Sequence, residues 1–378
     1  MKSLLIEGWR NINHSYSMVN QNQLIELYRH NFKIMHADVP YVNANWNYKN
    51  NNSGFDEKSI DLINHFPAPS DGSYLDITYR ISFPYRYNDS ESSKLFVFGT
   101  SEFQNLNGMI FEGNLKAGLE NKKLKIITPS NWSKVGFLKE GFQEERVLVI
   151  PHGVDTKKFK PLNAERRKEI RSNLNFINED FIFLSLGAMT PNKGIDLLIV
   201  AFATLKRKYG HIKLILKDSS NLYGIRGSTI IDAAIKSNPS LMSSEVLNSI
   251  LLFSNNFSLA NLSELYGMAD CYVSPYRAEG FNLTPLEAAA CGVPIIVTKG
   301  GATDDYFHKS FGSQIEGDLI NYTNKAYIEP SLESLITELS YIIEGGLTSI
   351  NKSVAIAYIE QKFTWTAVTS LLANEFNS

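Results

Sequence analysis

Two glutamates flank a glycine-containing loop in the stretch AEGFNLTPLEAAACGVPIIV, which runs from Ala278 to Val297. The first, Glu279, follows an apolar run and precedes Gly280, where a carboxylate has no structural need to be. Charged residues at the carboxyl end of a parallel strand point into the crevice in which α/β proteins bind ligands. Glu279 is therefore a candidate ligand-binding residue. The second glutamate, Glu287, lies on the segment that follows the loop.

That segment, TPLEAAACG from Thr284 to Gly292, is typical of a helix. Thr284 suits the N-cap, Pro285 suits the first helical position, and Gly292 suits the left-handed residue after the end. The free N–H groups and the dipole at such a helix start favour a bound phosphate. Because Glu287 lies three residues after Thr284, it also fits a capping box, so its carboxylate either caps the helix or binds a ligand.

Two lysines follow other predicted strands. Lys193 lies near the end of LGAMTPNKG, which starts in an apolar run and precedes a helical pattern. Its ammonium group can reach a phosphate as a point charge, or it can remain solvated in a turn. Lys217 ends the next strand, in LILKDSS. Its neighbouring aspartate makes a surface ion pair an equally good interpretation.

Several chemical motifs are absent from the sequence. It contains neither G-x-x-x-x-G-K-[ST] nor G-x-G-x-x-G, so a phosphate-loop NTPase and a dinucleotide-dependent oxidoreductase lose their main support. It contains no Asp-x-Asp pair for a divalent cation, and its two cysteines lack zinc-site spacing. We therefore expect no metal and no cofactor, with lysines and backbone amides neutralising any bound pyrophosphate.

The elements that must position these residues are short apolar runs alternating with longer amphipathic segments, a pattern that predicts parallel α/β sheets. A chain of 378 residues favours two domains, and the turn-forming stretch VIPHGVDTKKFKP places the boundary just after a strand. The expected strands of the first half cover residues 3–6, 61–63, 95–98, 125–127 and 147–150. Those of the second half cover residues 181–186, 212–216, 250–253, 271–274 and 294–297.

Charge and hydropathy limit the partners. The formal net charge of −2 argues against nucleic-acid binding. No apolar run approaches the ~20 residues of a membrane span, and the first ten residues do not resemble a signal peptide. We therefore expect a cytoplasmic protein. Local basic clusters at residues 122–125, 157–160 and 166–168 leave open a peripheral contact with the inner face of a membrane.

The stretch EGFNLTPLEAAACGVP, residues 279–294, resembles the E-x7-E signature of retaining glycosyltransferases of family 4, also called glycosyl transferases group 1. Three further pieces resemble that family in the same order: PHGVD at 151–155, KGIDLLI at 193–199 and LYGMADCYVSPYR at 265–277. The resemblance is specific over the second half of the chain and weak over the first.

The resemblance implies a GT-B fold, in which two Rossmann-like, doubly wound α/β domains face a central cleft. Residues 1–155 would form the acceptor-side domain, and residues 156–355 the domain that binds the nucleotide-sugar donor. The final segment, 356–378, contains FTWTAV and resembles the last helix of that fold, which crosses back to the first domain.

The resemblance also implies roles for individual residues. Glu287 would bind the ribose hydroxyls of the donor, and Glu279 would contact the transferred sugar. Lys193 would neutralise the departing pyrophosphate, on which negative charge builds in the transition state. The donor site would be completed by four residues at the helix start, of which the first three offer backbone N–H groups: Phe281, Asn282, Leu283 and Thr284.

This sequence departs from the family pattern at two points. Ala188 stands where the family commonly has an arginine, and either Lys217 or Arg277 is the candidate replacement. The usual G-F-G-L-P reads G-F-N-L-T-P, so Asn282 adds an amide near the sugar. In the first half, His65 lies where the family often has a strand ending in histidine. His65 is therefore a candidate active-site residue, with an ordinary loop histidine as the alternative.

Together these features predict a metal-independent, retaining, hexosyltransferase-like enzyme of polysaccharide biosynthesis. It would move a sugar from a nucleotide-sugar to an acceptor hydroxyl on a glycan or lipid-linked saccharide. A non-catalytic scaffold of the same fold is one alternative, which Ala188 favours. A nucleotide-sugar epimerase of that fold is another, which the order of the motifs disfavours. The nucleotide base, the sugar, the acceptor and the oligomeric state are left open.

Overall fold

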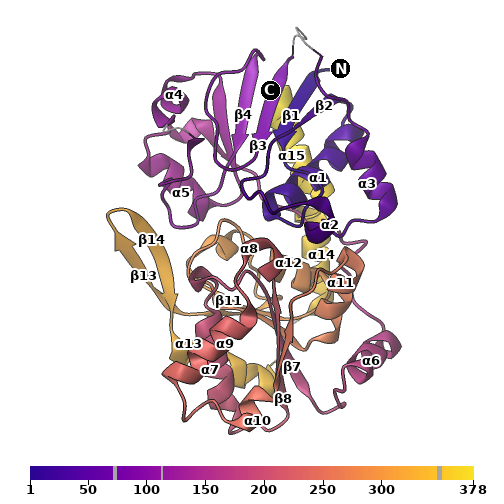
Figure 1. Ribbon diagram of the computed structural model, residues 1–378, viewed down its shortest axis with the longest axis vertical. Coiled ribbons are helices and arrows are strands. Elements are labelled where there is room, and N and C mark those ends of the chain that lie inside the picture. The colour runs from indigo at the N-terminus through magenta and orange to yellow at the C-terminus, as the bar shows by residue number, and fades with distance from the viewer. Residues whose placement is uncertain (71–74, 112–113, 347–350) are drawn as a thin grey trace. The chain divides into compact units, whose positions relative to one another are not determined.

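The computed structural model describes residues 1–70, 75–111, 114–346 and 351–378, which form two compact units (Figure 1). The first unit comprises Met1–Gly153 and Lys362–Ser378, and the second comprises Val154–Gln361. The chain thus returns to the first unit at Lys362 rather than at residue 356. The reason is that helix α14 (Lys352–Lys362) belongs largely to the second unit, where Ile356 lies beside Gly292.

The first unit contains a parallel six-stranded sheet of order β2-β1-β3-β4-β5-β6. Its strands are β1 (Ser3–Gly8), β2 (Lys33–Asp38), β3 (Ile77–Ile81), β4 (Lys94–Phe98), β5 (Leu124–Thr128) and β6 (Val147–Val149). Its helices are α1 (Ser15–Arg29), α2 (Tyr48–Asn51), α3 (Glu57–Asn64), α4 (Leu115–Glu120), α5 (Asn131–Lys139) and the C-terminal α15 (Trp365–Asn377).

Helix α15 is part of the core of the first unit. It begins after Thr364, whose hydroxyl accepts a hydrogen bond from the Ala367 N–H group. Near its end the Phe376 ring is fully buried, 4.8 Å from the Phe96 ring and 5.5 Å from the Tyr79 ring. A fully buried phenylalanine contributes about 1.5–3 kcal/mol, so this contact ties the chain end to the sheet.

The first unit also contains the main errors of the strand prediction. Residues 61–63 form part of helix α3, because the Asp56 carboxylate caps a helix start by accepting from the Ser59 N–H group. Strands β2 and β3 were not expected, since each carries a buried polar residue, His36 and Arg80 respectively. Arg80 is tolerated there because Glu7 of β1 accepts a hydrogen bond from its Nε at 2.7 Å.

The second unit contains another six-stranded parallel sheet, of order β12-β11-β10-β7-β8-β9, and an antiparallel hairpin of β13 and β14 that stands apart from it (Figure 1). All five strands expected here are confirmed. The strands are β7 (Phe181–Gly187), β8 (Ile212–Asp218), β9 (Ile250–Phe253), β10 (Cys271–Ser274), β11 (Ile295–Thr298), β12 (Gly312–Ile315), β13 (Gly317–Tyr322) and β14 (Lys325–Pro330).

The helices of the second unit are α6 (Ala164–Asn173), α7 (Ile195–Lys206), α8 (Ser220–Tyr223), α9 (Gly227–Ser237), α10 (Ser244–Leu247), α11 (Leu259–Met268), α12 (Leu283–Ala290), α13 (Leu332–Ile343) and α14. Most of them lie between or after the strands of the sheet, and α6 precedes these strands. Leu198 and Phe202 of α7 pack with Leu335 and Leu339 of α13 in one buried cluster that also includes residues of β7 and β8. This buried cluster packs α7 and α13 against β7 and β8, the strands whose ends carry the loop of Lys193 and the Lys217–Asp218 pair.

The parallel arrangement brings the carboxyl ends of β7, β8, β9 and β10 to one edge of the second sheet. Lys217 lies at the end of β8, Lys193 and Glu279 lie in the loops after β7 and β10, and Glu287 lies on α12, the helix after the Glu279 loop. Among the helices that the structure describes, none is both long and apolar enough to cross a membrane.

Candidate functional site

The candidate site lies where the strand order of the second sheet reverses. β7 begins the sheet in sequence, yet it pairs with β8 on one side and with β10 on the other. The chain therefore continues from β7 to β8 on one side and from β10 to β11 on the other, so the loops that follow these two adjacent strands diverge. Open α/β sheets bind their ligands in the crevice that such a reversal creates.

Lys193 and Glu279 meet at this point. Lys193 ends a 3-10 helix (Pro191–Lys193) after β7, and its ammonium donates to Oε1 of Glu279, which follows β10. Gly194 comes next with φ 67°, and a Cβ atom there would lie 1.9 Å from the Pro275 carbonyl oxygen. Only glycine allows this close approach of the two loops. The Glu279 side chain is 6% exposed and that of Lys193 is 24% exposed, so the structure brings two predicted site residues together in a largely dehydrated pair.

Arg277 joins the surrounding elements. Its guanidinium forms two hydrogen bonds of 2.9 Å with Asp196 in the first turn of α7, and it also donates to Glu329 of β14. The hydrogen bonds to Asp196 are the largest cause of a raised Arg277 pKa. Its backbone N–H donates to the Asn192 carbonyl at 2.7 Å. Arg277 thus connects the two loops and the hairpin, and these contacts give no support to its predicted role as the replacement cation.

The predicted start of α12, with Thr284 as N-cap, is wrong by two residues. The helix begins at Leu283, and its N-cap is Asn282, which has the left-handed φ of 65° that asparagine tolerates better than most residues. The Asn282 amide donates to Ser274 Oγ at 2.9 Å instead of facing solvent. Thr284 lies inside the helix, and its hydroxyl accepts from Tyr272 at 2.7 Å. Phe281 is buried against Tyr306, with 5.0 Å between the ring centroids.

Glu287 lies in the next turn of α12 and is buried. Its Oε2 atom accepts a hydrogen bond from the Tyr266 hydroxyl at 2.7 Å. Burial raises the Glu287 pKa to about 7, and the hydrogen bond from Tyr266 opposes that rise. The carboxylate is therefore held by a tyrosine of α11, and not by the capping box that its spacing from Thr284 suggested.

Lys217 and Asp218 end β8 and do not form a surface ion pair. The Lys217 ammonium donates to the Asp218 carbonyl at 2.8 Å, and burial lowers its pKa. The Asp218 carboxylate is fully buried and accepts from the Gly227 N–H group, the Ser220 N–H group and the Ser254 hydroxyl at 2.8–3.0 Å. Asp218 thereby ties the end of β8 to the start of α9 and to the residue after β9.

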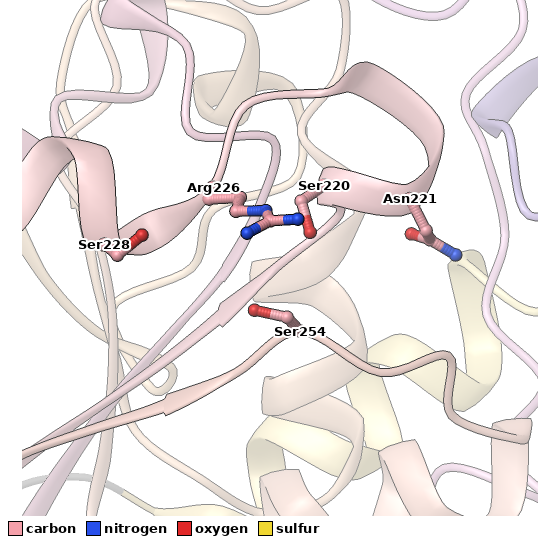
Figure 2. Close-up of a pocket in the computed structure, with 5 residues that line it drawn as sticks. All are labelled: Ser220, Asn221, Arg226, Ser228 and Ser254. Carbon is pink, nitrogen blue, oxygen red and sulfur yellow. The ribbon is translucent and has the colours of Figure 1, made fainter.

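A polar cavity of about 470 Å³ opens beside Asp218 (Figure 2). It is lined by Ser220, Asn221, Arg226, Ser228 and Ser254. Figure 2 shows the Arg226 guanidinium extending toward Ser220 and above Ser254. A cavity of this size accommodates part of a small ligand. We did not expect these residues from the sequence, where the only signal was the polar run that follows the Lys-Asp pair.

His65 lies in the first unit as the exposed C-cap of α3. The strand that was expected to precede it is a helix, so the reasoning that selected this residue is not supported, and its catalytic role stays a prediction. In the part of the chain that the structure describes, no group of three or more His, Cys, Asp or Glu side chains is arranged to hold a metal ion. Metal independence also stays a prediction.

Comparison with known proteins identifies the class. Residues 166–336, which lie within the second unit, match the family of glycosyl transferases group 1. The match covers the loops of Lys193 and Glu279, the cavity and all of α12. The resemblance drawn from the E-x7-E stretch is confirmed.

Individual relatives agree with this class. The chain is 31% identical over 161 residues to mannosylfructose-phosphate synthase of Agrobacterium fabrum, an alignment that covers 43% of this chain and 34% of that protein. It is 25% identical over 189 residues to lipopolysaccharide 1,2-N-acetylglucosaminetransferase of Salmonella typhimurium, covering 50% and 47% respectively. The chain thus spans less than half the length of these curated relatives.

The fold is that of solved glycosyltransferases. The structure of Anabaena Alr3699/HepE in complex with UDP and glucose aligns over 100% of both chains with a TM-score of 0.70 and 16% sequence identity. At this level of identity the likeness concerns the fold alone. The predicted GT-B fold, with two doubly wound α/β domains, is confirmed.

Proposed function

We propose that this protein is a retaining glycosyltransferase that moves a sugar from a nucleotide-sugar to an acceptor hydroxyl. The observation that carries the proposal is the Lys193–Glu279 pair at the reversal of strand order, together with the buried carboxylate of Glu287 on α12, the helix that follows the Glu279 loop. A cation, a carboxylate and the start of a helix meet there. These are the groups needed to hold a diphosphate and a sugar at once.

In this proposal Lys193 stabilises the diphosphate as it leaves. The bond between the sugar C1 and the diphosphate oxygen breaks, and the acceptor oxygen forms its bond to C1 on the same face. The acceptor proton passes to an oxygen of the departing diphosphate, so no protein base is required. Glu279 contacts the sugar and stabilises the positive charge that develops at its ring, while the first N–H groups of α12 face the distal phosphate.

The rest of the donor follows the same edge of the sheet. A carboxylate accepts hydrogen bonds at both oxygens, and we assign Glu287 to the ribose hydroxyls. Lys217 lies at the end of β8, and the cavity lined by Arg226 and Ser254 comes after β8 and β9, the next strand ends along the edge. We place the nucleoside end of the donor toward that cavity.

We further propose that the acceptor is a glycan or a lipid-linked saccharide, met on the cytoplasmic side of a membrane. Support comes from the Salmonella relative, a lipopolysaccharide 1,2-N-acetylglucosaminetransferase. We propose no metal in the reaction, since Lys193 and backbone N–H groups supply positive charge where the diphosphate would lie.

A thermal-shift panel tests the proposal without knowledge of the acceptor. The purified chain would be heated with UDP, GDP, ADP, dTDP, CMP and their common sugar conjugates, with and without EDTA. A ligand at 100 times its Kd adds about 2.7 kcal/mol of stability, which raises the melting temperature measurably. A selective shift that survives EDTA is the expected result. No shift with any nucleotide would overturn the proposal in favour of a non-catalytic scaffold, which the replacement of a loop arginine by Ala188 would then explain.

A further inference from the structure

Three buried tyrosine hydroxyls hold the entrance and first turns of α12. Tyr306 donates to the Asn282 carbonyl, Tyr272 donates to the Thr284 hydroxyl, and Tyr266 donates to the Glu287 carboxylate. Each of the three distances is 2.7 Å. The first two hydrogen bonds fix the backbone entry and the first turn. The third holds the carboxylate that we assign to the donor ribose, and it comes from a different helix, α11.

We propose that Tyr266 is a positioning residue that orients the Glu287 carboxylate for the two hydroxyls of the donor ribose. This inference rests on the proposed function, because it uses the ribose assignment of Glu287. The hydrogen bond from Tyr266 engages Oε2. It thereby turns the carboxylate so that Oε1 and the second lone pair of Oε2 remain as acceptors for a ligand.

The Tyr266 ring is rigid enough for this task. It is fully buried, and its centroid lies 6.0 Å from that of Phe159 and 5.7 Å from that of Tyr272. The Tyr272 hydroxyl in turn lies 3.3 Å from both backbone polar atoms of Leu186, near the end of β7. The orientation of Glu287 is therefore tied through packed rings to the strand that leads into the Lys193 loop.

Burial raises the pKa of Glu287 to about 7. The titratable side chains that face it are Tyr266 from α11, Tyr272 from β10, Tyr306 after β11 and Cys291 at the end of its own helix. Burial raises the pKa of all four, so they stay neutral near pH 7. The proton that Tyr266 donates stabilises the ionised form of Glu287 against burial. Removing the hydroxyl should leave the carboxyl protonated to a higher pH.

The test compares Tyr266→Phe with Tyr79→Phe. Tyr79 is a matched control in the first unit, where its buried hydroxyl donates to Gln23 at 3.0 Å. Binding of UDP and of GDP would be measured by calorimetry from pH 6 to pH 9.

We expect Tyr266→Phe to weaken binding of the accepted nucleotide about tenfold at pH 7 and to recover part of the loss at pH 9. With donor and acceptor supplied, KM for the donor should rise more than kcat falls. Tyr79→Phe should keep the wild-type pH profile.

A second readout needs no nucleotide. The side-chain carboxyl of Glu287 would be titrated by carbon NMR in the wild type, in Tyr266→Phe and, to assign the signal, in Glu287→Gln. A higher Glu287 pKa in Tyr266→Phe is expected, and an unchanged one overturns the inference. If nucleotides bind Glu287→Gln as well as the wild type, the ribose assignment and the inference fail while the proposed function stands. If the wild type binds no nucleotide, the proposed function fails and the inference fails with it, whatever the NMR titration shows.

Discussion

The ammonium group of Lys193 contacts the carboxylate of Glu279 across the point where the second sheet reverses its strand order. The two residues come from loops after different strands and form an ion pair. A diphosphate that enters the site offers Lys193 a second anionic partner. Under the proposed function, donor binding would exchange one partner of this ammonium group for another, so the role of each residue of the pair can be tested by substitution.

Replacement of Glu279 by glutamine should separate binding from turnover. The variant frees Lys193 from its counter-ion, so we expect a nucleoside diphosphate to bind about 3- to 10-fold more tightly. Loss of the carboxylate that faces the sugar should lower kcat by about 100-fold or more. Calorimetry and initial-rate kinetics measure the two effects. Glu316→Gln, which removes the carboxylate of an exposed ion pair with Lys299, is the control. Turnover at the wild-type rate would remove Glu279 from the mechanism.

Replacement of Lys193 by methionine should cost both activity and stability. It leaves the buried Glu279 carboxylate without its ammonium partner, which we expect to lower the free energy of unfolding by about 1–3 kcal/mol at pH 7. Urea denaturation measures this change. The double variant Lys193→Met, Glu279→Gln should recover most of the stability and none of the turnover. Equal stability of Lys193→Met and the wild type would show that the pair contributes nothing to folding.

Donor binding should depend on the ionisation of Glu287. With a pKa of about 7, this carboxyl is mostly protonated at pH 6 and mostly ionised at pH 8. The ionised form accepts hydrogen bonds at both oxygens, so affinity for the accepted nucleotide should rise roughly tenfold between these two pH values. Glu287→Gln should bind weakly and show no such step. A flat wild-type profile from pH 6 to pH 8 would contradict the ribose assignment.

The same carboxyl should lower the stability of the fold at high pH. Its pKa rises from 4.5 to about 7 on folding, because burial disfavours the ionised form. Between these values the folded chain binds more protons than the unfolded chain, so this contribution to the free energy of unfolding is complete below pH 4.5 and is lost as pH rises through 7. Glu287→Gln should therefore be more stable than the wild type at pH 8. Urea denaturation at pH 5 and pH 8 compares the free energies of unfolding of Glu287→Gln and the wild type. If the variant is no more stable than the wild type at pH 8, burial of the ionised Glu287 carboxylate does not destabilise the fold.

The sequence predicted those strands and site residues that a run of neighbouring residues is enough to indicate. The five strands predicted in the second sheet are mostly apolar runs, and Lys193 and Glu279 could be selected because each follows such a run. The sixth strand, β12, reads GSQI and carries no such signal, so it was not predicted. In the first unit, β2 and β3 escaped notice because a histidine and an arginine interrupt their apolar pattern. Those polar side chains are stabilised by partners that the sequence does not place beside them, such as Glu7 for Arg80.

The contacts within the site could not be predicted for the same reason. Tyr266 belongs to a different helix from Glu287. Asp196 lies 81 residues before Arg277 and Glu329 lies 52 residues after it. A capping box for Glu287 and a phosphate contact for Arg277 were reasonable local interpretations. Tertiary hydrogen bonds gave both side chains other partners, and only the folded chain shows which partner each one has.

Arg277 offers the last test, which distinguishes a cross-link from a ligand-binding cation. Arg277→Lys keeps the charge but loses the paired hydrogen bonds to Asp196, so a cross-linking role predicts a donor KM about 3- to 10-fold higher. Glu329→Gln keeps the guanidinium and weakens its tie to β14, and should also raise KM. Lys299→Gln, which removes one half of an exposed ion pair, serves as the control and should change little. If Arg277 instead binds the diphosphate, Glu329→Gln should release it and lower KM, and that result would restore Arg277 as the replacement for the missing loop arginine.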